Sequence, residues 1–352
     1  MKKRVTILYN IPLPRELAEM GTYSREKAKE ILAKYPQLDL SESAVLEELH
    51  DMVVALNASG FETRAVNIND DFDFLIEELR LRRPDVIFNL CESMHSVSKN
   101  EAYIAGVYEL FRIPYTGAAP EALSIAVRKA RTKSIFMQQG IPTAPFALFA
   151  SPDAVHLNGS FSFPCIVKPA EEDASIGIEP AAIVTSEQAV RDRVAFILEK
   201  FHQPALVENY IDGRELNVAI LGDAHPEILP ISEIDFSTLP DGLPKILSYQ
   251  AKWVEDSEYY KCTIGKCPAE LPADVEARVK DIAMKAFRAI GVRDYARVDF
   301  RLTRDMQPFV LEVNPNPDLA SNAGFMRSVR GAGRTFEETL AKIVGFALER
   351  AA

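Results

Sequence analysis

Strand-like and helix-like segments alternate along the first third of this 352-residue chain. Short runs enriched in β-branched and aromatic residues predict strands at 5–9, 61–66 and 86–89. Apolar side chains at helical spacing predict helices at 43–58, 73–82 and 101–110. Alternation of this kind is typical of a doubly wound parallel sheet covered by helices. No Gly-x-Gly-x-x-Gly follows the first strand, so we expect no dinucleotide there.

The pattern changes near residues 117–123, where we place a domain boundary. A basic helix is expected at 128–139, because Gly140 and Pro142 follow it. Beyond it we expect strands at 146–149, 164–168, 183–184, 205–208 and 215–221, and helices at 186–201, 274–290 and 335–350. The expected domains are therefore an N-terminal α/β domain over 1–120 and two α+β subdomains over 121–210 and 211–352.

Two segments interrupt this regular pattern. Residues 15–42 are charged and irregular, and we expect a helical excursion there after the first strand. Residues 236–266 have few periodic apolar positions and several Pro, Gly and Asp. A loop of that length in a compact protein is usually functional or disordered, so we expect a lid.

Two stretches near the C-terminus, 297–300 and 310–314, predict the strands of a hairpin. Because side chains alternate faces along a strand, Leu311 and Val313 are expected on the apolar face. The opposite face then carries Arg297, Asp299, Glu312 and Asn314. Taken singly, Arg297 or Asp299 would suit an ordinary solvated face. Three oxygen-bearing side chains together favour a Mg²⁺ site that also holds substrate phosphates.

Upstream segments carry weaker signals for a nucleotide. Lys168 ends a buried strand beside the loop 170–177, which contains Ser175, and a lysine there suits a phosphate. Three acidic residues at 171–173 would repel phosphate unless they point away. The carboxylate of Glu208 could accept from an exocyclic amine between apolar neighbours. Taken alone, a residue such as Lys168 is more often a surface lysine, and the segment of Glu208 suits a connecting strand equally well.

Taken in series, these positions resemble the ATP-grasp superfamily, and most closely the D-alanine–D-alanine ligases and their relatives. The matching positions are Lys129, Lys168, Glu208-Asn209-Tyr210-Ile211, Asp212-Gly213-Arg214-Glu215, Lys252, Arg297-x-Asp299 and Glu312-x-Asn314-Pro315. The likeness runs over roughly residues 113–345, and the N-terminal third matches in general plan and in Ile113-Pro114-Tyr115-Thr116-Gly117.

The resemblance implies an ATP-grasp fold, with ATP between two α+β subdomains behind the N-terminal domain. It assigns the phosphates to Lys129, Lys168 and Ser175, the adenine to Glu208, Asn209, Tyr210 and Ile211, and the ribose to Glu215. Asp299, Glu312 and Asn314 would hold two Mg²⁺, or Mn²⁺ in their place. Lys252 would close over the γ-phosphate, and Arg297 would face an acyl phosphate and the oxyanion that follows it.

The chain departs from these ligases in its substrate half. Their Gly-Gly-x-Ser-x-Glu stretch is replaced by the residues from Asn10 to Pro14, and their His-Gly segment by Cys91-Glu92-Ser93. Paired serines become Ala174-Ser175, the lid tyrosine becomes Trp253, and Pro-Gly-Met-Thr becomes Pro317-Asp318-Leu319-Ala320. Glu92 suits an ammonium, although helix capping explains it equally. Asp318 would repel a carboxylate and suit a cationic acceptor.

We therefore expect an ADP-forming carboxylate–amine ligase that acts on small molecules other than two D-alanines. The alternatives are a genuine D-alanine–D-alanine ligase with a rebuilt pocket and a non-catalytic ATP-binding regulatory protein. A formal charge of −11 argues against a nucleic-acid surface, and no apolar run is long enough to span a membrane. Four scattered cysteines suit reduced thiols in the cytoplasm. Family analogy alone suggests a homodimer.

Overall fold

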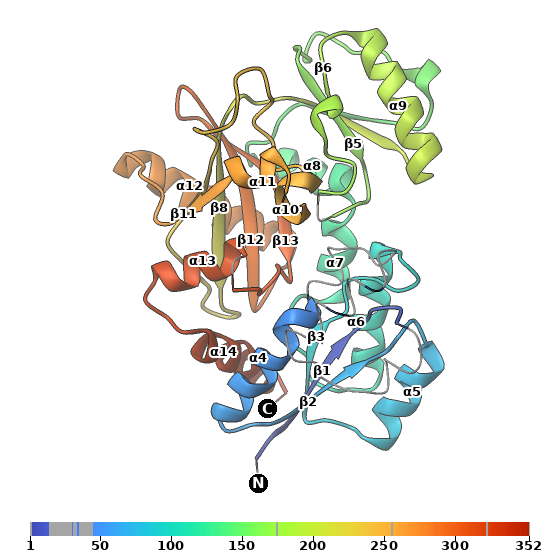
Figure 1. Cartoon of the computed structure of the whole chain (residues 1–352), viewed down its shortest axis with the longest axis vertical. Helices are drawn as coiled ribbons and strands as arrows, with labels where there is room; N and C mark the ends of the chain where they lie inside the picture. The colour runs from blue at the N-terminus through green and yellow to red at the C-terminus, as the bar shows by residue number, and fades with distance from the viewer. Residues whose placement is uncertain are drawn as a thin grey trace.

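The protein is described from a computed structural model, which covers residues 2–13, 30, 34, 45–173, 175–254, 256–321 and 323–351. The expected excursion over 15–42 lies outside these residues, apart from Glu30 and Lys34. Three sheets form three lobes, with the N-terminal lobe at the bottom of Figure 1 and two further lobes above it.

The N-terminal lobe is the parallel sheet predicted from the alternation of strands and helices. Its strand order is β2–β1–β3, with β1 at Arg4–Tyr9, β2 at Glu62–Asn67 and β3 at Val86–Leu90. Helices α5 (Phe72–Leu81) and α6 (Glu101–Leu110) share a core with Leu8 and Ile87. Helix α4 (Val45–Ala58) shares the other core with Val5 and Ile7. Both faces of the sheet are therefore covered, as a parallel sheet requires.

The second lobe is an antiparallel sheet in the order β4–β7–β5–β6. Its strands are β4 (Phe146–Phe149), β5 (Cys165–Pro169), β6 (Ile183–Val184) and β7 (Ala205–Asn209). Helix α9 (Glu187–Phe201) packs on it and begins at Ser186, whose side chain accepts from the amide of Ala189. Helices α7 (Pro120–Ala126) and α8 (Lys129–Gln138) lead into this lobe. Helix α7, which buries Ala122, Leu123 and Ala126, lies where we expect the domain boundary near residues 117–123.

The third lobe is built on a sheet in the order β11–β10–β8–β12–β13, with β9 beside β8. The strands are β8 (Gly213–Leu221), β9 (Glu227–Ile228), β10 (Ser232–Asp235), β11 (Ile264–Lys266), β12 (Tyr295–Thr303) and β13 (Pro308–Pro315). The helices are α12 (Ala273–Ala289), α13 (Gly324–Gly331) and α14 (Phe336–Glu349). Short 3₁₀ turns occur at Ser98–Asn100, Pro152–Ala154 and Pro180–Ala182. Helix α14 shares a core with α4, so the end of the chain returns to the N-terminal lobe (Figure 1).

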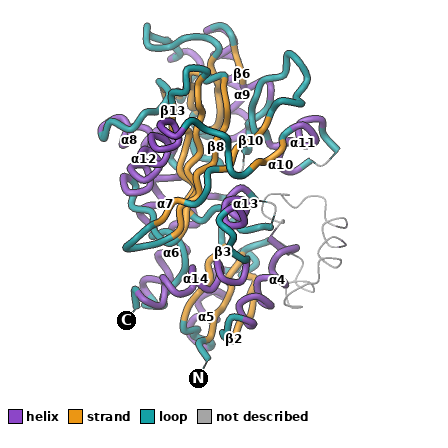
Figure 2. The backbone as a smooth tube through the Cα atoms, turned by 90° about the vertical axis from the view of Figure 1, so that its left-hand side faces the viewer, coloured by secondary structure: helices purple, strands orange, loops and turns teal. Residues whose placement is uncertain are grey.

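The segment 236–266 is more ordered than the expected long loop. It contains two short helices, α10 (Tyr249–Trp253) and α11 (Glu258–Cys262), and ends in β11. Ser248 and Ser257 cap the two helices. The segment buries Ile246, Ala251 and Tyr259 in a small core of its own. Figure 2 shows these helices and α12 on opposite sides of the large sheet.

A buried carboxylate ties the N-terminal lobe to the large sheet. Asp294, which has no exposed surface, accepts from the amide of Gly117 at 2.7 Å and from the guanidinium of Arg350 at 2.9 Å. The same guanidinium donates to the carbonyl of Tyr115 at 2.9 Å. Three segments distant in sequence therefore meet at one ion pair, which fixes how the lobes sit together.

Replacing Arg350 with methionine is expected to reduce stability by about 2–3 kcal/mol, because Asp294 would remain buried without its cation. The matched control is Arg304→Met, since Arg304 pairs with Asp212 on the surface at 2.8 Å and is 83% exposed. That change should cost less than about 1 kcal/mol. Urea unfolding followed by circular dichroism measures both variants, and equal effects would contradict this account of the junction.

Candidate active site

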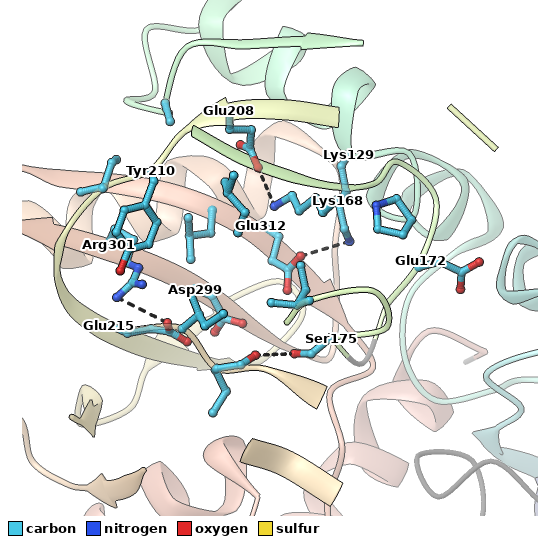
Figure 3. A pocket seen from close by; sticks show the side chains of 18 of the residues that line it. Lys129, Lys168, Glu172, Ser175, Glu208, Tyr210, Glu215, Asp299, Arg301 and Glu312 are labelled. Atoms are coloured by element: carbon cyan, nitrogen blue, oxygen red, sulfur yellow. Dashed lines mark hydrogen bonds and ion pairs between the residues drawn. The ribbon is translucent and has the colours of Figure 1, made fainter. Parts of the chain in front are cut away.

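A pocket lies between the small antiparallel sheet of the second lobe, the large sheet of the third lobe and the lid segment 236–266 (Figure 3). Eleven of the residues selected from sequence line it: Lys129, Lys168, Ser175, Glu208, Asn209, Tyr210, Ile211, Glu215, Lys252, Asp299 and Glu312. The other five, Arg297, Asn314, Glu92, Trp253 and Asp318, lie outside its lining.

The C-terminal hairpin supplies one wall of the pocket. Asp299 pairs with Glu312, and Arg297 pairs with Asn314, so the predicted polar face is confirmed. The register shifts after Asp299, and Leu311 is the residue without a partner at this bulge. Leu311 was expected on the apolar face, but it lines the pocket beside Glu312. The bulge, which strict alternation cannot reveal, therefore adds an apolar surface next to the carboxylates.

Asp299 is the most heavily bonded group of the hairpin. Arg297 donates to both of its oxygens at 2.8 Å, and Asn217 donates at 2.7 Å. Asn314 donates through Nδ2 at 2.8 Å, and the same nitrogen lies 3.5 Å from Glu312. These bonds hold the carboxylate still and buried, with 6% of its surface exposed.

Glu312 faces a lysine from the small lobe. The Nζ of Lys129 lies 3.1 Å from Glu312 and 3.1 Å from Asp173. Burial alone would raise the pKa of Glu312, but the ammonium groups of Lys129, Lys168 and Lys252 outweigh it and hold this pKa well below its usual range. Glu312 is therefore an anion at every physiological pH, as a metal ligand must be.

In their present orientation, the side chains of the hairpin provide only part of a site for a hard cation. Across the described residues, no three Asp, Glu, His or Cys side chains gather into a metal site. Two carboxylates, Asp299 and Glu312, face each other across the hairpin, and Asn314 is the third candidate. Its amide nitrogen now points at both carboxylates, so the amide would have to turn its oxygen inward. Two carboxylates plus substrate phosphates form a usual Mg²⁺ environment.

A second charged cluster lies on the small-sheet side of the pocket. One oxygen of Glu208 lies 2.5 Å from the Nζ of Lys133, and the other lies 2.6 Å from the Nζ of Lys168. These are ion-pair distances, and neither oxygen makes a hydrogen bond with good angular geometry. Burial acts to raise the pKa of Glu208, but the two ammonium groups lower it below its usual range. Lys133 was not selected from sequence, although it lies one helical turn after Lys129.

Apolar side chains and one arginine also line the pocket. Ile166, Ile178 and Leu247 line the pocket near Tyr210. The Arg301 guanidinium lies 5.5 Å from the Tyr210 ring centroid and 3.7 Å from the Glu215 carboxylate. Glu215 is itself buried, so the alternative of an ordinary exposed carboxylate is wrong. Arg301 was missed, although alternation along β12 puts it on the face of Arg297 and Asp299.

Two acidic residues of the loop after β5, Glu172 and Asp173, line the pocket, and each side chain has a polar partner. Asp173 pairs with Lys129, and Glu172 accepts from the side chain of Gln203 at 2.7 Å. Figure 3 shows Glu172 pointing outward. Ser175 adopts a φ of 64° and donates to the carbonyl of Leu247 at 2.8 Å. This bond joins the loop to the lid segment, so loop and lid meet over the pocket.

The expected substrate residues lie beyond the pocket lining. Glu92 follows β3 and is exposed, and Trp253 is half-buried at the end of α10. Asp318 follows the hairpin and accepts from the amide of Ala320 at 2.8 Å. Partial burial raises the pKa of Asp318, and the amide of Ala320 and the charges of Arg297 and Lys252 oppose that rise.

Comparison with known proteins identifies the family. A family model described as the D-Ala–D-Ala ligase C-terminus matches residues 135–345. The chain belongs to the D-alanine–D-alanine ligase family. An uncharacterised protein of Sinorhizobium fredii is 31% identical over 306 residues, covering 85% of this chain and 87% of that protein. The D-alanine–D-alanine ligase of Bordetella avium is 33% identical over 255 residues, covering 72% of this chain and 75% of that enzyme.

Solved structures of this ligase family share the fold. The Bacillus anthracis D-alanine–D-alanine ligase complexed with ATP matches with a TM-score of 0.70 and 21% identity, covering 99% of this chain and 98% of that one. The predicted ATP-grasp fold and the prediction of a ligase enzyme are thereby confirmed. Among the residues that the structure describes, no helix is both long and apolar enough to cross a membrane.

Proposed function

We propose that this ligase-family member is an ADP-forming carboxylate–amine ligase that works through an acyl phosphate. We further propose that its substrates are amino acids or related small molecules other than two D-alanines. One observation carries the proposal: phosphate-type lysines from the small lobe and the hairpin carboxylates open into one pocket, where Lys129 already contacts Glu312 at 3.1 Å. Such a pocket brings a polyphosphate and a metal together.

ATP would lie between the units 121–210 and 211–352. The apolar slot beside Tyr210 suits the adenine ring, with Glu208, Asn209 and Ile211 around it. The buried carboxylate of Glu215 suits the ribose hydroxyls. Lys129, Lys168 and Ser175 line the pocket and would contact the phosphates. This assignment supplies a cation or donor for each anionic part of the nucleotide.

Asp299, Glu312 and Asn314 would hold two Mg²⁺ ions, or Mn²⁺ in their place. When bound, the metal offsets the repulsion between a carboxylate substrate and the triphosphate. Neighbouring residues position these carboxylates in the absence of metal: Arg297 and Asn217 hold Asp299 in place, and Lys129 holds Glu312. The carboxylates are therefore positioned in advance.

The reaction would run in two steps. A carboxylate oxygen of the first substrate attacks the γ-phosphorus, and the bond to the β-phosphate oxygen breaks to release ADP. An amine then attacks the acyl carbon, and phosphate leaves with the substrate's oxygen. Arg297 stabilises the oxyanion, because a fixed guanidinium is most effective where negative charge develops. Lys252, on the lid segment, neutralises the γ-phosphate and helps exclude water.

The second substrate would enter past Asp318. This carboxylate would repel an acceptor carboxylate and favour a cationic acceptor, while Glu92 would hold an ammonium group and Trp253 would close the lid. The names of the curated relatives favour a second candidate, a true D-alanine–D-alanine ligase with a rebuilt pocket. An ADP-release screen with amino acids, polyamines and hydroxy acids, singly and in pairs, separates the two. Release driven by D-alanine alone would refute the first candidate.

The contact between Lys129 and Glu312 also predicts how a substitution changes metal affinity in the absence of nucleotide. Lys129→Met is expected to bind free Mn²⁺ about tenfold more tightly than the wild type, because it removes a cation 3.1 Å from Glu312. Arg131→Met, an exposed change of the same charge on α8, is the control and should have no effect. Electron paramagnetic resonance counts free Mn²⁺ directly. Equal affinities for the two variants would contradict the metal assignment of Glu312.

A further inference from the structure

Lys133 is a buried cation that the proposed chemistry leaves without a role. It lies on α8 one turn after Lys129, and its side chain is 1% exposed. It is not among the residues that line the pocket. Its Nζ lies 2.5 Å from Glu208 and donates to the hydroxyl of Thr143 at 2.6 Å. A buried ammonium is unfavourable unless it is paired, and the anion that pairs with Lys133 is Glu208.

On the proposed function, the groups that surround Glu208 change when ATP binds in the pocket. Its second oxygen contacts Lys168 at 2.6 Å, as Figure 3 shows. In the proposed function Lys168 turns toward the phosphates, which leaves Lys133 as the cation beside Glu208. Burial favours the neutral form of a carboxyl group, and the two lysines oppose that tendency in Glu208. With both lysines gone, a buried carboxylate would take up a proton.

The protonation state decides which base Glu208 can recognise. An ionised carboxylate only accepts hydrogen bonds, whereas a protonated carboxyl also donates one. Adenine offers an amino group at C6, which donates. Hypoxanthine offers a carbonyl oxygen at the same place, which accepts. We propose that Lys133 is a positioning residue that keeps Glu208 an obligate acceptor and so selects a purine with a C6 amino group.

Lys133 is also anchored so that it stays when Lys168 leaves. Thr143, which accepts from Lys133, donates to the carbonyl of Val310 at 2.9 Å. Thr143 and Val310 also form a parallel bridge, so this contact joins the small lobe to β13. The ammonium of Lys133 is therefore held between the two lobes. It should stay beside Glu208 when the nucleotide phosphates attract Lys168.

The test compares ATP with ITP, which differ only at the base, by calorimetry in Mg²⁺ buffer without other substrates. The wild type should prefer ATP by about 100-fold. In Lys133→Met that preference should fall about tenfold or more, because Glu208 becomes a donor. The matched control is Lys129→Met, the same substitution one turn away, which should weaken both nucleotides equally. If Lys133→Met fails to fold, Lys133→Gln keeps a donor without the charge and should show the same fall.

The outcomes separate this inference from the proposed function on which it rests. A preference that is unchanged in the Lys133 variant, or that falls equally in both variants, overturns it. A wild type that binds ATP and ITP equally also overturns it, because Glu208 then does not read the base. A wild type that binds neither nucleotide refutes the proposed function itself. A purely structural role for Lys133 would weaken both nucleotides by one factor and leave their ratio unchanged.

Discussion

Glu312→Gln is expected to lower ADP formation by about 10³-fold or more, because a neutral amide would not supply the negative charge that holds the metal. Glu312 lies opposite Asp299 in the hairpin register and 3.1 Å from Lys129. Its pKa lies well below the usual range, so it is charged whenever the enzyme works. Steady-state assays with the substrate pair found by the ADP screen measure the loss.

The control for this variant is Glu337→Gln, an exposed change of the same chemistry on α14. It should leave the rate within a factor of about two, as surface changes usually do. Higher Mn²⁺ concentrations should restore part of the rate in Glu312→Gln, because the substitution weakens metal binding. Full turnover in that variant would remove Glu312 from the metal site and with it the proposed mechanism.

Arg297→Met is expected to lower kcat by about 10²–10³-fold, the usual loss when one group that stabilises an oxyanion is removed. ATP affinity should change little, because Arg297 lies outside the pocket lining. Arg297→Lys should recover only part of the loss, since the two 2.8 Å bonds to Asp299 need the planar guanidinium. Measuring kcat and the ATP Kd separately tests this. An unchanged kcat with weakened ATP binding would assign Arg297 to the nucleotide instead.

Much of the fold was predictable because periodicity reports which side chains are buried. The helices and strands of the N-terminal lobe lie within two residues of the expected ranges, since both faces of that sheet pack against helices. The helices α7 and α13 and the two lid helices were missed. Helices this short gain little from intrinsic propensity and depend on tertiary packing, which the sequence does not display.

The site was predictable where the chain itself sets the geometry. Alternation along β12 and β13 brought Arg297, Asp299, Glu312 and Asn314 together as expected. The bulge that turns Leu311 into the pocket depends on the partner strand, and a single strand pattern does not contain it.

The two missed cations have different causes. Arg301 followed the same alternation as Arg297 and Asp299, so the signal was present. Lys133 could not be told from a surface lysine, because it is buried against Glu208 and Thr143, which lie on other segments of the fold. A buried charge is visible only once the fold brings its partners together.

The most direct test of the central claim follows an oxygen atom. A carboxylate substrate from the ADP screen, labelled with ¹⁸O in its carboxyl group, is turned over with ATP and an amine. If an acyl phosphate forms, the phosphate released carries one labelled oxygen for each ADP, detected by mass spectrometry or ³¹P resonance. Phosphate without label would show that water, not the carboxylate, attacks the γ-phosphorus, and would contradict the ligase mechanism.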